Sequence, residues 1–257
     1  MTLNDRDIDA AIRDRGLITN SNPRGLAGAC YELRMGSVYY DLTEGGKRFA
    51  LSEGEHALIK PGHRVVLITA EELNVPPNLL VRIISKGALF SIGLSPVSTY
   101  ADPGFAGNLG IVTQNISDKY IVLPQGEPIA KADFTQLSGN ADRPYHGQHG
   151  FQAGIWPIKA HLQKEYSEVS GDSRVESERQ ESLALLPSAT RTAIERLENT
   201  LAIMLVAVFI AIALNAVFLF LVQGQLLDQF WGIVGNLASS AIIGIASIFI
   251  NSSRRNR

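Results

Sequence analysis

The sequence predicts a mainly β domain with a short N-terminal helix, followed by an α-helical hairpin that crosses a membrane twice. The distribution of charge supports this division. Asp228 is the only charged residue between positions 201 and 250, although the 257 residues include 23 Lys and Arg and 25 Asp and Glu. The residues before position 160 instead show short β-branched runs separated by Gly and Pro, a pattern typical of strands and turns. We therefore expect a charged, folded part and an apolar, membrane part.

A short amphipathic helix is expected over residues 5–15. Asn4 is a favourable N-cap, Ile8 and Ile12 repeat at helical spacing, and Gly16 stands where a helix commonly ends. The first 18 residues contain no apolar stretch of the kind that a secretory signal requires. We therefore expect this part of the chain to remain in the cytosol.

After this helix, five β-branched runs predict strands. They alternate with the turn signals KPGH, VPPN, DPGF and PQGE. Short strands at this spacing favour a closed or sandwiched sheet. The runs are RVVLITA at 64–70, LLVRIIS at 79–85, LGIVTQN at 109–115, KYIVLP at 119–124 and PIAKADFTQL at 128–137.

Composition excludes several classes of function. Residues 1–200 contain 20 Lys and Arg against 24 Asp and Glu, a net charge of −4, so they offer no basic surface for nucleic acid. Cys30 is the only cysteine. A single thiol can form neither a disulfide within the chain nor a Cys-rich zinc site. We expect a reducing compartment and no nucleic-acid partner.

The middle of the chain is expected to connect two parts that differ in composition. Residues 163–190 are rich in Glu, Ser and Arg and poor in aromatic residues, which predicts a linker or a loosely held helix without a core. Ser188, which follows Pro187, can begin a helix that runs into the apolar stretch. The expected organisation is a domain at 1–162, a linker with a juxtamembrane helix at 163–200, and two membrane helices with a basic tail at 201–257.

The apolar part contains two candidate membrane spans. Residues 201–222 carry no charge, and at 1.5 Å per residue they are long enough to cross a hydrocarbon core of about 30 Å. The alternative, a buried core helix, would need a large protein around it. Residues 232–250 form a second, weaker span because they include Gly, Ser and Asn.

The charges that flank the spans predict their orientation. The connector QGQLLDQFW contains no Lys or Arg, whereas the tail NSSRRNR contains three Arg. The positive-inside rule then places both termini, and with them the first domain, in the cytoplasm, as a multi-pass protein of the inner or plasma membrane in contact with lipid. Asn215 lies within the first span, where an unpaired amide is costly. It should therefore face another helix, through a structural hydrogen bond, or a pore.

Five strings of residues resemble, in order and spacing, the dCTP deaminase branch of the dUTPase superfamily. The resemblance implies a β-clip barrel and a homotrimer with active sites between subunits. It also implies a deoxypyrimidine nucleotide as the ligand. The strings are LNDRDIDAAIRDRGLI at 3–18, CYELRMG at 30–36, VPPNLLVRIISKGAL at 75–89, DPGFAGNLGIVTQN at 102–115 and RPYHGQHGFQAGIWP at 143–157.

Two positions depart from the pattern of that family. Deamination of a cytosine ring needs a base that activates water and an acid that protonates the leaving amine, and in the family one Glu does both, ten residues after the Asp of the DPG turn. Counting ten residues from Asp102 leads to Val112, which cannot move a proton. The family's phosphate-binding Arg, four residues after Ser85, is replaced by Leu89. The resemblance therefore implies the fold more strongly than the chemistry.

Other positions match the nucleotide site. The resemblance implies that Asp102 binds the deoxyribose and, as in dUTPases, orients the water that attacks the α-phosphate. Ser85 and Lys86 are the candidate phosphate contacts, although an ammonium is a point charge and not a bidentate fork. Tyr145 and Gln152 match the residues that close over the phosphates. The resemblance to this metal-free family implies no metal bound by the protein itself and, if any ion, Mg²⁺ bound through those phosphates. The alternative is that DPG is only a turn, in which Asp is favoured for its bond to the local backbone.

Three functions remain open from the sequence. The first is a degenerate nucleotide sensor that controls the membrane hairpin, favoured by Val112 and Leu89. The second is a membrane-anchored, dUTPase-like hydrolase of deoxynucleoside triphosphates that acts through Asp102. Deamination of dCTP comes third.

Overall fold

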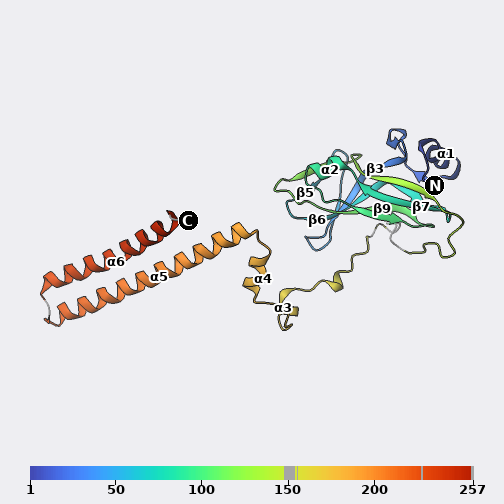
Figure 1. Ribbon diagram of the computed structural model, residues 1–257. Coiled ribbons are helices and arrows are strands. Elements are labelled where there is room, and N and C mark those ends of the chain that lie inside the picture. Colours follow the sequence, from blue (N-terminus) through green and yellow to red (C-terminus); the bar gives the residue numbers. More distant parts are fainter. Residues whose placement is uncertain (148–153, 155, 227, 256–257) are drawn as a thin grey trace. The chain divides into compact units, whose positions relative to one another are not determined.

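The computed structural model describes residues 1–147, 154, 156–226 and 228–255 (Figure 1). The chain divides into two compact units, Met1–Ala160 and His161–Arg257. The first unit is built mainly of strands, so the predicted mainly β domain is confirmed.

The helices of the first unit are α1 (Asp5–Arg15) and α2 (Gly87–Ser91), with a 3-10 turn at Pro23–Gly25. Its strands are β1 (Ile18–Thr19), β2 (Leu26–Ala27), β3 (Cys30–Asp41), β4 (Lys47–Ala50), β5 (His56–Ile59), β6 (Arg64–Asn74), β7 (Leu79–Ser85), β8 (Ser98–Ala101), β9 (Ala106–Gln114), β10 (Ile121–Pro124) and β11 (Pro128–Gln136).

Helix α1 begins and ends where its sequence predicts. The side chain of Asn4 accepts a hydrogen bond from the backbone N–H of Asp7, and Gly16 adopts the left-handed conformation that ends the helix. Gly16 donates its N–H to the carbonyl of Ile12 at 3.1 Å, which satisfies one of the free carbonyls of the last turn. Ile8 and Ala11 are buried, so the apolar face of α1 packs on the core of the first unit.

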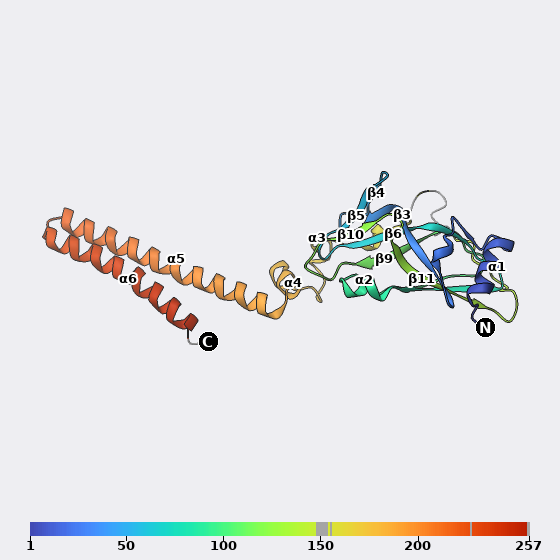
Figure 2. The ribbon, with the colours of Figure 1, turned by 90° about the horizontal axis from the view of Figure 1, so that it is seen from above.

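The strands form one curled sheet and a separate two-stranded ribbon (Figure 2). The path of the nine-stranded sheet is β1-β6-β3-β11-β7-β8, with β2 and β4 also paired to β3 and β9 paired to β6. Strands β5 and β10 pair with each other. The described strands are thus divided between two sheets and do not close into a single ring. All the pairs are antiparallel.

The long strand β3 bends because its two halves pair with different partners. Its first half pairs with β11, and its second half pairs with β6. The β3–β6 register shifts between Met35 and Tyr39, next to Gly36. A Cβ atom at Gly36 would lie 2.9 Å from the carbonyl oxygen of Ile68. Glycine is therefore required where β3 crosses close to the backbone of β6.

A buried carboxylate connects β3 to β6. Glu71 accepts hydrogen bonds from the backbone N–H of Arg34 at 2.8 Å and from Nε of the same arginine at 2.5 Å. The hydroxyl of Tyr31 donates to the same carboxylate at 3.4 Å, and burial raises the pKa of Tyr31 above its ordinary value. Nη2 of Arg34 also donates to the carbonyl of Asn20 at 2.7 Å. Because the side chain of Glu71 is fully buried and that of Arg34 is 23% exposed, the carboxylate depends on Arg34 for its counter-charge.

The second unit contains two short helices followed by two long ones. The short helices are α3 (Tyr166–Val169) and α4 (Glu178–Ala184), in the segment predicted as a linker, and neither has a buried residue. The long helices are α5 (Ser188–Gln223) and α6 (Gln229–Arg255), which lie side by side (Figures 1 and 2). Helix α5 starts at Ser188, as predicted, and runs into the apolar stretch without interruption.

Small residues of α6 allow its close contact with α5. A Cβ atom added to Gly235 would lie 2.4 Å from the ring of Phe218, and Gly232 faces Val222. Ser239 is buried and donates to the carbonyl of Gly235 at 2.8 Å. Small residues of this kind permit two helix backbones to approach closely.

One helix in the described part of the chain is long and apolar enough to cross a membrane. It is α5, whose most apolar window has a mean hydropathy of 3.0 and is 11% buried. In α6 the apolar stretch Phe230–Ala246 is shorter. The predicted two-span membrane hairpin is therefore not confirmed: α5 alone meets the length and composition of a span among the described helices.

We expect Arg34→Ala to lower the free energy of unfolding of the first unit by about 3–5 kcal/mol, because it leaves the buried Glu71 without a counter-charge. Arg13→Ala, which breaks an exposed ion pair with Asp9, should cost less than about 1 kcal/mol. In a Trp231→Phe background Trp156 is the only tryptophan, so urea unfolding followed by its fluorescence reports on the first unit. Equal losses in the two variants would contradict the proposed dependence of Glu71 on Arg34.

Candidate active-site cleft

A cleft of about 500 Å³ lies between the end of β8 and the face of β9. The lining includes Tyr100 and Asp102, together with Gly110 and Val112 of β9. Three aromatic residues, Phe105, Tyr145 and Trp156, also line it, as do Pro96, Val97, Ser98, Thr99 and Leu109. The volume is in the range of small-molecule sites. Asp102 is the only carboxylate among the described residues that line the cleft.

The DPG turn places Asp102 at the mouth of this cleft. The carbonyl of Asp102 accepts the N–H of Phe105 at 2.9 Å, which closes the turn. Gly104 has a φ of +89°, a conformation that favours glycine, and Tyr145 donates its backbone N–H to Pro103 at 2.7 Å. The turn is thus made entirely by backbone groups.

The side chain of Asp102 is not used by this turn. Its carboxylate is exposed, and it accepts no hydrogen bond from the described part of the chain. An aspartate selected only for turn formation would normally bond its own local backbone. The exposed carboxylate therefore favours a role in the cleft over the alternative of a simple turn.

Tyr145 is brought to the cleft, as the sequence predicts. Its ring centre lies 5.8 Å from that of Phe105, at an interplanar angle of 41°. This tilted aromatic contact, together with its hydrogen bond to Pro103, holds Tyr145 beside the DPG turn. Gln152, the other residue predicted to close over the phosphates, lies outside the described residues.

Val112 lies in the cleft at the position where a catalytic Glu is expected. It pairs with Val66 across the β6–β9 ladder, and its side chain is 46% exposed. Val112 and Asp102 therefore line the same cleft. A proton-transferring side chain at this point would face the cleft, but an isopropyl group occupies it.

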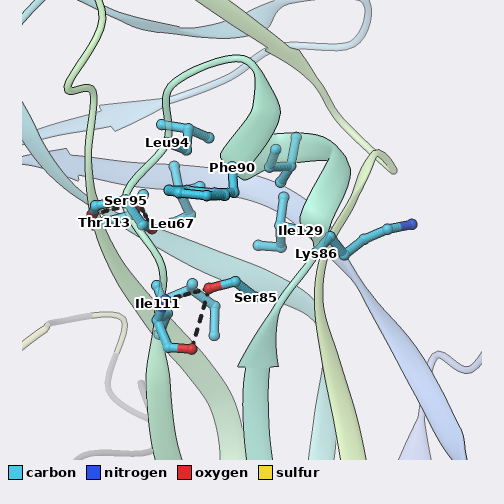
Figure 3. Close-up of a pocket in the computed structure, with 11 residues that line it drawn as sticks. Leu67, Ser85, Lys86, Phe90, Leu94, Ser95, Ile111, Thr113 and Ile129 are labelled. Carbon is cyan, nitrogen blue, oxygen red and sulfur yellow. Dashed lines mark hydrogen bonds between the residues drawn. The ribbon is translucent and has the colours of Figure 1, made fainter.

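Ser85 and Lys86 line a different pocket (Figure 3). Its volume of about 10 Å³ is close to that of a single water site. The hydroxyl of Ser85 accepts the N–H of Val97 and donates to the carbonyl of the same residue at 3.2 Å. Nζ of Lys86 lies away from this pocket and donates to Glu32 at 2.9 Å. The two predicted phosphate contacts are therefore engaged within the chain and are not part of the Asp102 cleft.

Leu89, which replaces the expected arginine, is buried in the main core. It lies on α2, in the wall of the small pocket beside Ser85. The substitution therefore removes a cation from this loop and adds an apolar side chain to the packing. In the described part of the cleft wall no Lys or Arg takes its place.

Trp156 is a wall of the cleft that the sequence analysis missed. A Cβ atom at Gly110 would lie only 2.4 to 2.7 Å from three atoms of the indole ring, so the ring rests directly on the backbone of β9. The hydroxyl of Tyr40 donates to the carbonyl of Gly154 at 3.2 Å and accepts the backbone N–H of Trp156 at 3.3 Å. The available signal was Gly110 itself, because a glycine inside a strand often marks a close approach.

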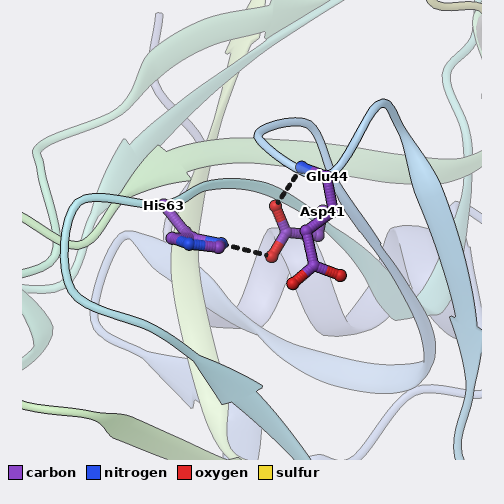
Figure 4. A group of neighbouring side chains, drawn as sticks. All are labelled: Asp41, Glu44 and His63. Carbon is purple, nitrogen blue, oxygen red and sulfur yellow. Dashed lines mark hydrogen bonds and ion pairs between the residues drawn. The ribbon is translucent and has the colours of Figure 1, made fainter.

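A second cluster of titratable groups has a structural role. Asp41, Glu44 and His63 have ligand atoms within 4.8 Å of one another (Figure 4). The buried carboxylate of Asp41 accepts the N–H groups of Thr43 and Glu44 and bonds Nδ1 of His63 at 2.8 Å, and Glu44 pairs with Lys60. These bonds hold the turn after β3 against the residues that precede β6.

Comparison with known proteins identifies the family. A family model described as dCTP deaminase-like matches residues 2–137, more than half of the chain. The chain belongs to the dCTP deaminase-like family. The match includes Ser85, Asp102 and Val112, whereas Tyr145 and the whole second unit lie beyond its end.

Individual relatives have modest identity to this member of the dCTP deaminase-like family. The dCTP deaminase of Thermococcus gammatolerans is 29% identical over 141 residues, which cover 55% of this chain and 88% of the relative. The dUMP-forming dCTP deaminase of Dictyoglomus turgidum is 25% identical over 170 residues, 58% of this chain and 88% of the relative. Among solved structures, the 2′-deoxycytidine 5′-triphosphate deaminase of Agrobacterium tumefaciens has a TM-score of 0.45 and 16% identity, with 52% of this chain and 47% of that chain covered.

We expect Gly110→Ala to displace the indole ring of Trp156, because the added methyl group would overlap it. Overpacking of this kind typically costs about 1–3 kcal/mol. In the Trp231→Phe background the emission of Trp156 should shift to the red and become more accessible to acrylamide. Gly139→Ala is the matched control, because a Cβ atom there meets nothing within 4 Å. Unchanged emission in Gly110→Ala would contradict the contact.

Proposed function

We propose that the chain is a membrane-anchored binding module for deoxypyrimidine nucleotides and that occupancy of the Asp102 cleft controls the helical hairpin. The observation that carries this proposal is Val112. It occupies the cleft where the family resemblance implies the Glu that activates water and protonates the leaving amine. A family domain that keeps its cleft and loses its proton-transfer group is suited to binding without turnover.

The lining of the cleft supports binding. Asp102 presents a free carboxylate, which can accept hydrogen bonds from a sugar hydroxyl. Tyr100, Phe105 and Tyr145 supply aromatic surface with hydroxyl groups at its edge. Mg²⁺ fits this site best as an ion carried by the nucleotide phosphates, since Mg²⁺ commonly combines one or two carboxylates with substrate oxygens, and only one carboxylate is present among the described lining residues.

The predicted phosphate contacts fit a site shared between subunits. Ser85 and Lys86 do not line the Asp102 cleft of their own chain, and a homotrimer with sites between subunits would bring the Ser85 loop of one copy to the cleft of another. Lys86 would then exchange its ion pair with Glu32 for a phosphate. Such an exchange would couple nucleotide binding to the Glu32–Lys86 pair.

Anchoring in the inner or plasma membrane is the second part of the proposal. Helix α5 has the length and composition of a membrane span, and the three Arg of the C-terminal tail favour a cytoplasmic position for both termini. Asn215, the one polar residue in the apolar stretch 201–222 of α5, is suited to a contact with another helix of the assembly. The nucleotide domain would then face the cytoplasm.

A dUTPase-like hydrolase is the second candidate, favoured by the exposed carboxylate of Asp102, which accepts no hydrogen bond from the described residues. A carboxylate in this state can orient and deprotonate a water molecule that attacks a phosphate. Hydrolysis would need no group at Val112. Deamination, by contrast, would need one and remains the third candidate.

We expect the wild-type chain to bind dCTP and dUTP and to release neither ammonia nor pyrophosphate. Asp102→Asn should weaken binding by about 1–3 kcal/mol, the usual cost of an unmet polar partner. Asp118→Asn, at an exposed surface carboxylate, should leave binding unchanged. The measurements are calorimetric titration and product analysis. Release of pyrophosphate by the wild type that is lost in Asp102→Asn would favour the hydrolase, and release of ammonia would favour the deaminase.

We expect the full-length chain to remain in the membrane pellet after extraction with alkaline carbonate. A chain that ends at Lys164 should stay in the supernatant and form a trimer in light scattering. The physical reason is the uncharged stretch of 22 residues that begins at Leu201. A full-length chain found in the supernatant would rule out the membrane anchor, and a monomeric shortened chain would rule out the trimer.

A further inference from the structure

Polar and small residues line one flank of α6. Asn236, Ser240 and Gly244 are spaced four residues apart, so they lie along one side of the helix, and all three are exposed. Successive residues of a helix are turned by about 100° from one another. Asn236 and Ser240 therefore point away from the contact with α5, in which the residues just before them, Gly235 and Ser239, are buried. We call these three exposed positions the open flank of α6.

The packing of α6 on α5 gives the open flank a depth in the membrane. Gly235 lies against the ring of Phe218, so α6 runs beside the uncharged stretch 201–222 of α5. The middle of that stretch lies about 10 Å further along α5 than Phe218, and Ser240 lies about 8 Å further along α6 than Gly235. Where α5 crosses a membrane, the open flank therefore lies within about 10 Å of the middle of a hydrocarbon core that is about 30 Å thick.

An amide at this depth needs a hydrogen-bonding partner. The side chain of Asn236 has none among the described residues, whereas its backbone carbonyl accepts the hydroxyl of Ser240 at 3.0 Å. The serine hydroxyl is thus satisfied within the helix, but the N–H donors and the oxygen of the asparagine amide are not. Lipid tails offer neither donors nor acceptors, so a polar side chain in the hydrocarbon core faces another helix or water.

The open flank is complementary to a second copy of itself. An asparagine amide carries both donors and an acceptor, so it can pair with the same amide of another chain, as single Asn residues do in the seams of coiled coils. Ser240 and Gly244 are small enough for two helix backbones to approach closely, and a Cβ atom at Gly244 would meet nothing within 4 Å. Residues 229–253 carry no charge, so two copies of α6 do not repel each other.

The surface of α5 has a different character. Every exposed residue in its stretch 201–222 is apolar, and large side chains such as Leu205, Phe209 and Phe220 are 69%, 75% and 73% exposed. Such a surface is suited to lipid tails, which are as apolar as these side chains. The two helices of the hairpin therefore divide the tasks of facing lipid and facing protein.

We propose that the open flank of α6 is the surface through which the hairpins of neighbouring copies pack against each other in the membrane. The inference rests on the proposed membrane anchoring and specifies what the hairpin contacts. Hydrogen bonds between Asn236 side chains join the copies, and α5 lies outside them against lipid. Control of the hairpin by the nucleotide domain then acts on the contact between copies of α6.

The experiment uses the purified full-length chain with Cys30→Ser, reconstituted in phosphatidylcholine vesicles. An added cysteine is then the only thiol, and every partner is another copy. Ser240→Cys and Gly244→Cys should each form disulfide-linked dimers on oxidation with copper phenanthroline. Ala238→Cys is the matched control, because Ala238 is also exposed. It lies about 200° around the helix from Ser240 and should give about tenfold less dimer.

The contribution of the amide is tested in the Ser240→Cys chain. Asn236→Leu should slow dimer formation by about 3- to 30-fold, the equivalent of one hydrogen bond between membrane helices. Asn236→Gln keeps an amide and should retain most of the rate. Circular dichroism checks that each variant keeps its helical content, so that a slower rate reports on the contact and not on unfolding.

Several outcomes would overturn the inference and leave the membrane anchor standing. These are equal dimer yields from Ser240→Cys and Ala238→Cys, an unchanged rate in Asn236→Leu, and rapid reaction of Ser240→Cys with a membrane-impermeant thiosulfonate, which would show that the flank faces water. Release of the full-length chain from the vesicles by alkaline carbonate would overturn the anchor and the inference together. Nucleotide binding is measured separately by calorimetry and depends on neither result.

Discussion

The register of β9 on β6 is the constraint on which the cleft depends, and hydrogen bonds at one irregularity fix it. The ladder shifts between Ile68 and Glu72. There the amide of Asn108 donates to the carbonyls of Thr69 and Glu71 at 3.0 and 3.1 Å. The hydroxyl of Thr69 donates to the carbonyl of Glu71 and accepts the N–H of Leu109. A slip of one residue would turn Gly110 and Val112 to the opposite face of the sheet, which would remove the contact of Trp156 with Gly110 and take the side chain of Val112 out of the cleft.

Local physics explains why much of the fold could be predicted from the sequence. Caps and spacing define α1, because Asn4 and Gly16 satisfy backbone groups that no other residues reach. The β-branched runs coincide with β6, β7, β9, β10 and β11 to within a few residues. The DPG turn could be located as well, since a glycine with positive φ and a proline restrict the chain to few conformations. The long strand β3 is not among the predicted runs, because Val38 is its one β-branched residue.

The candidate site was less accessible to prediction, because its geometry depends on contacts between distant segments. Asp102, Tyr145 and Val112 meet in one cleft, whereas Ser85 and Lys86 are engaged by Val97 and Glu32. Nothing near Lys86 in the sequence indicates that Glu32 would be its partner. Trp156 contacts Gly110 although it lies 46 residues further along the chain. The contact is possible because Gly110 has no side chain, and the chemistry of the neighbouring residues gives no sign of it.

Val112 and Leu89, the two departures from the family pattern, have different consequences. The first concerns proton transfer, and the second concerns both the charge of the loop and the stability of the core. Val112 is half-exposed in the cleft, so its presence removes a proton-transfer group while the packing beneath it stays intact. Leu89 is buried among the core residues of the first unit, so its presence contributes to stability as well as removing a cation. An arginine at Leu89 would place a charge where an apolar side chain now packs, at a cost that a buried, unpaired charge always carries. The missing proton-transfer group at Val112 can therefore be considered separately from the stability of the fold. The missing cation at Leu89 cannot, because the leucine side chain that replaces it packs in the core.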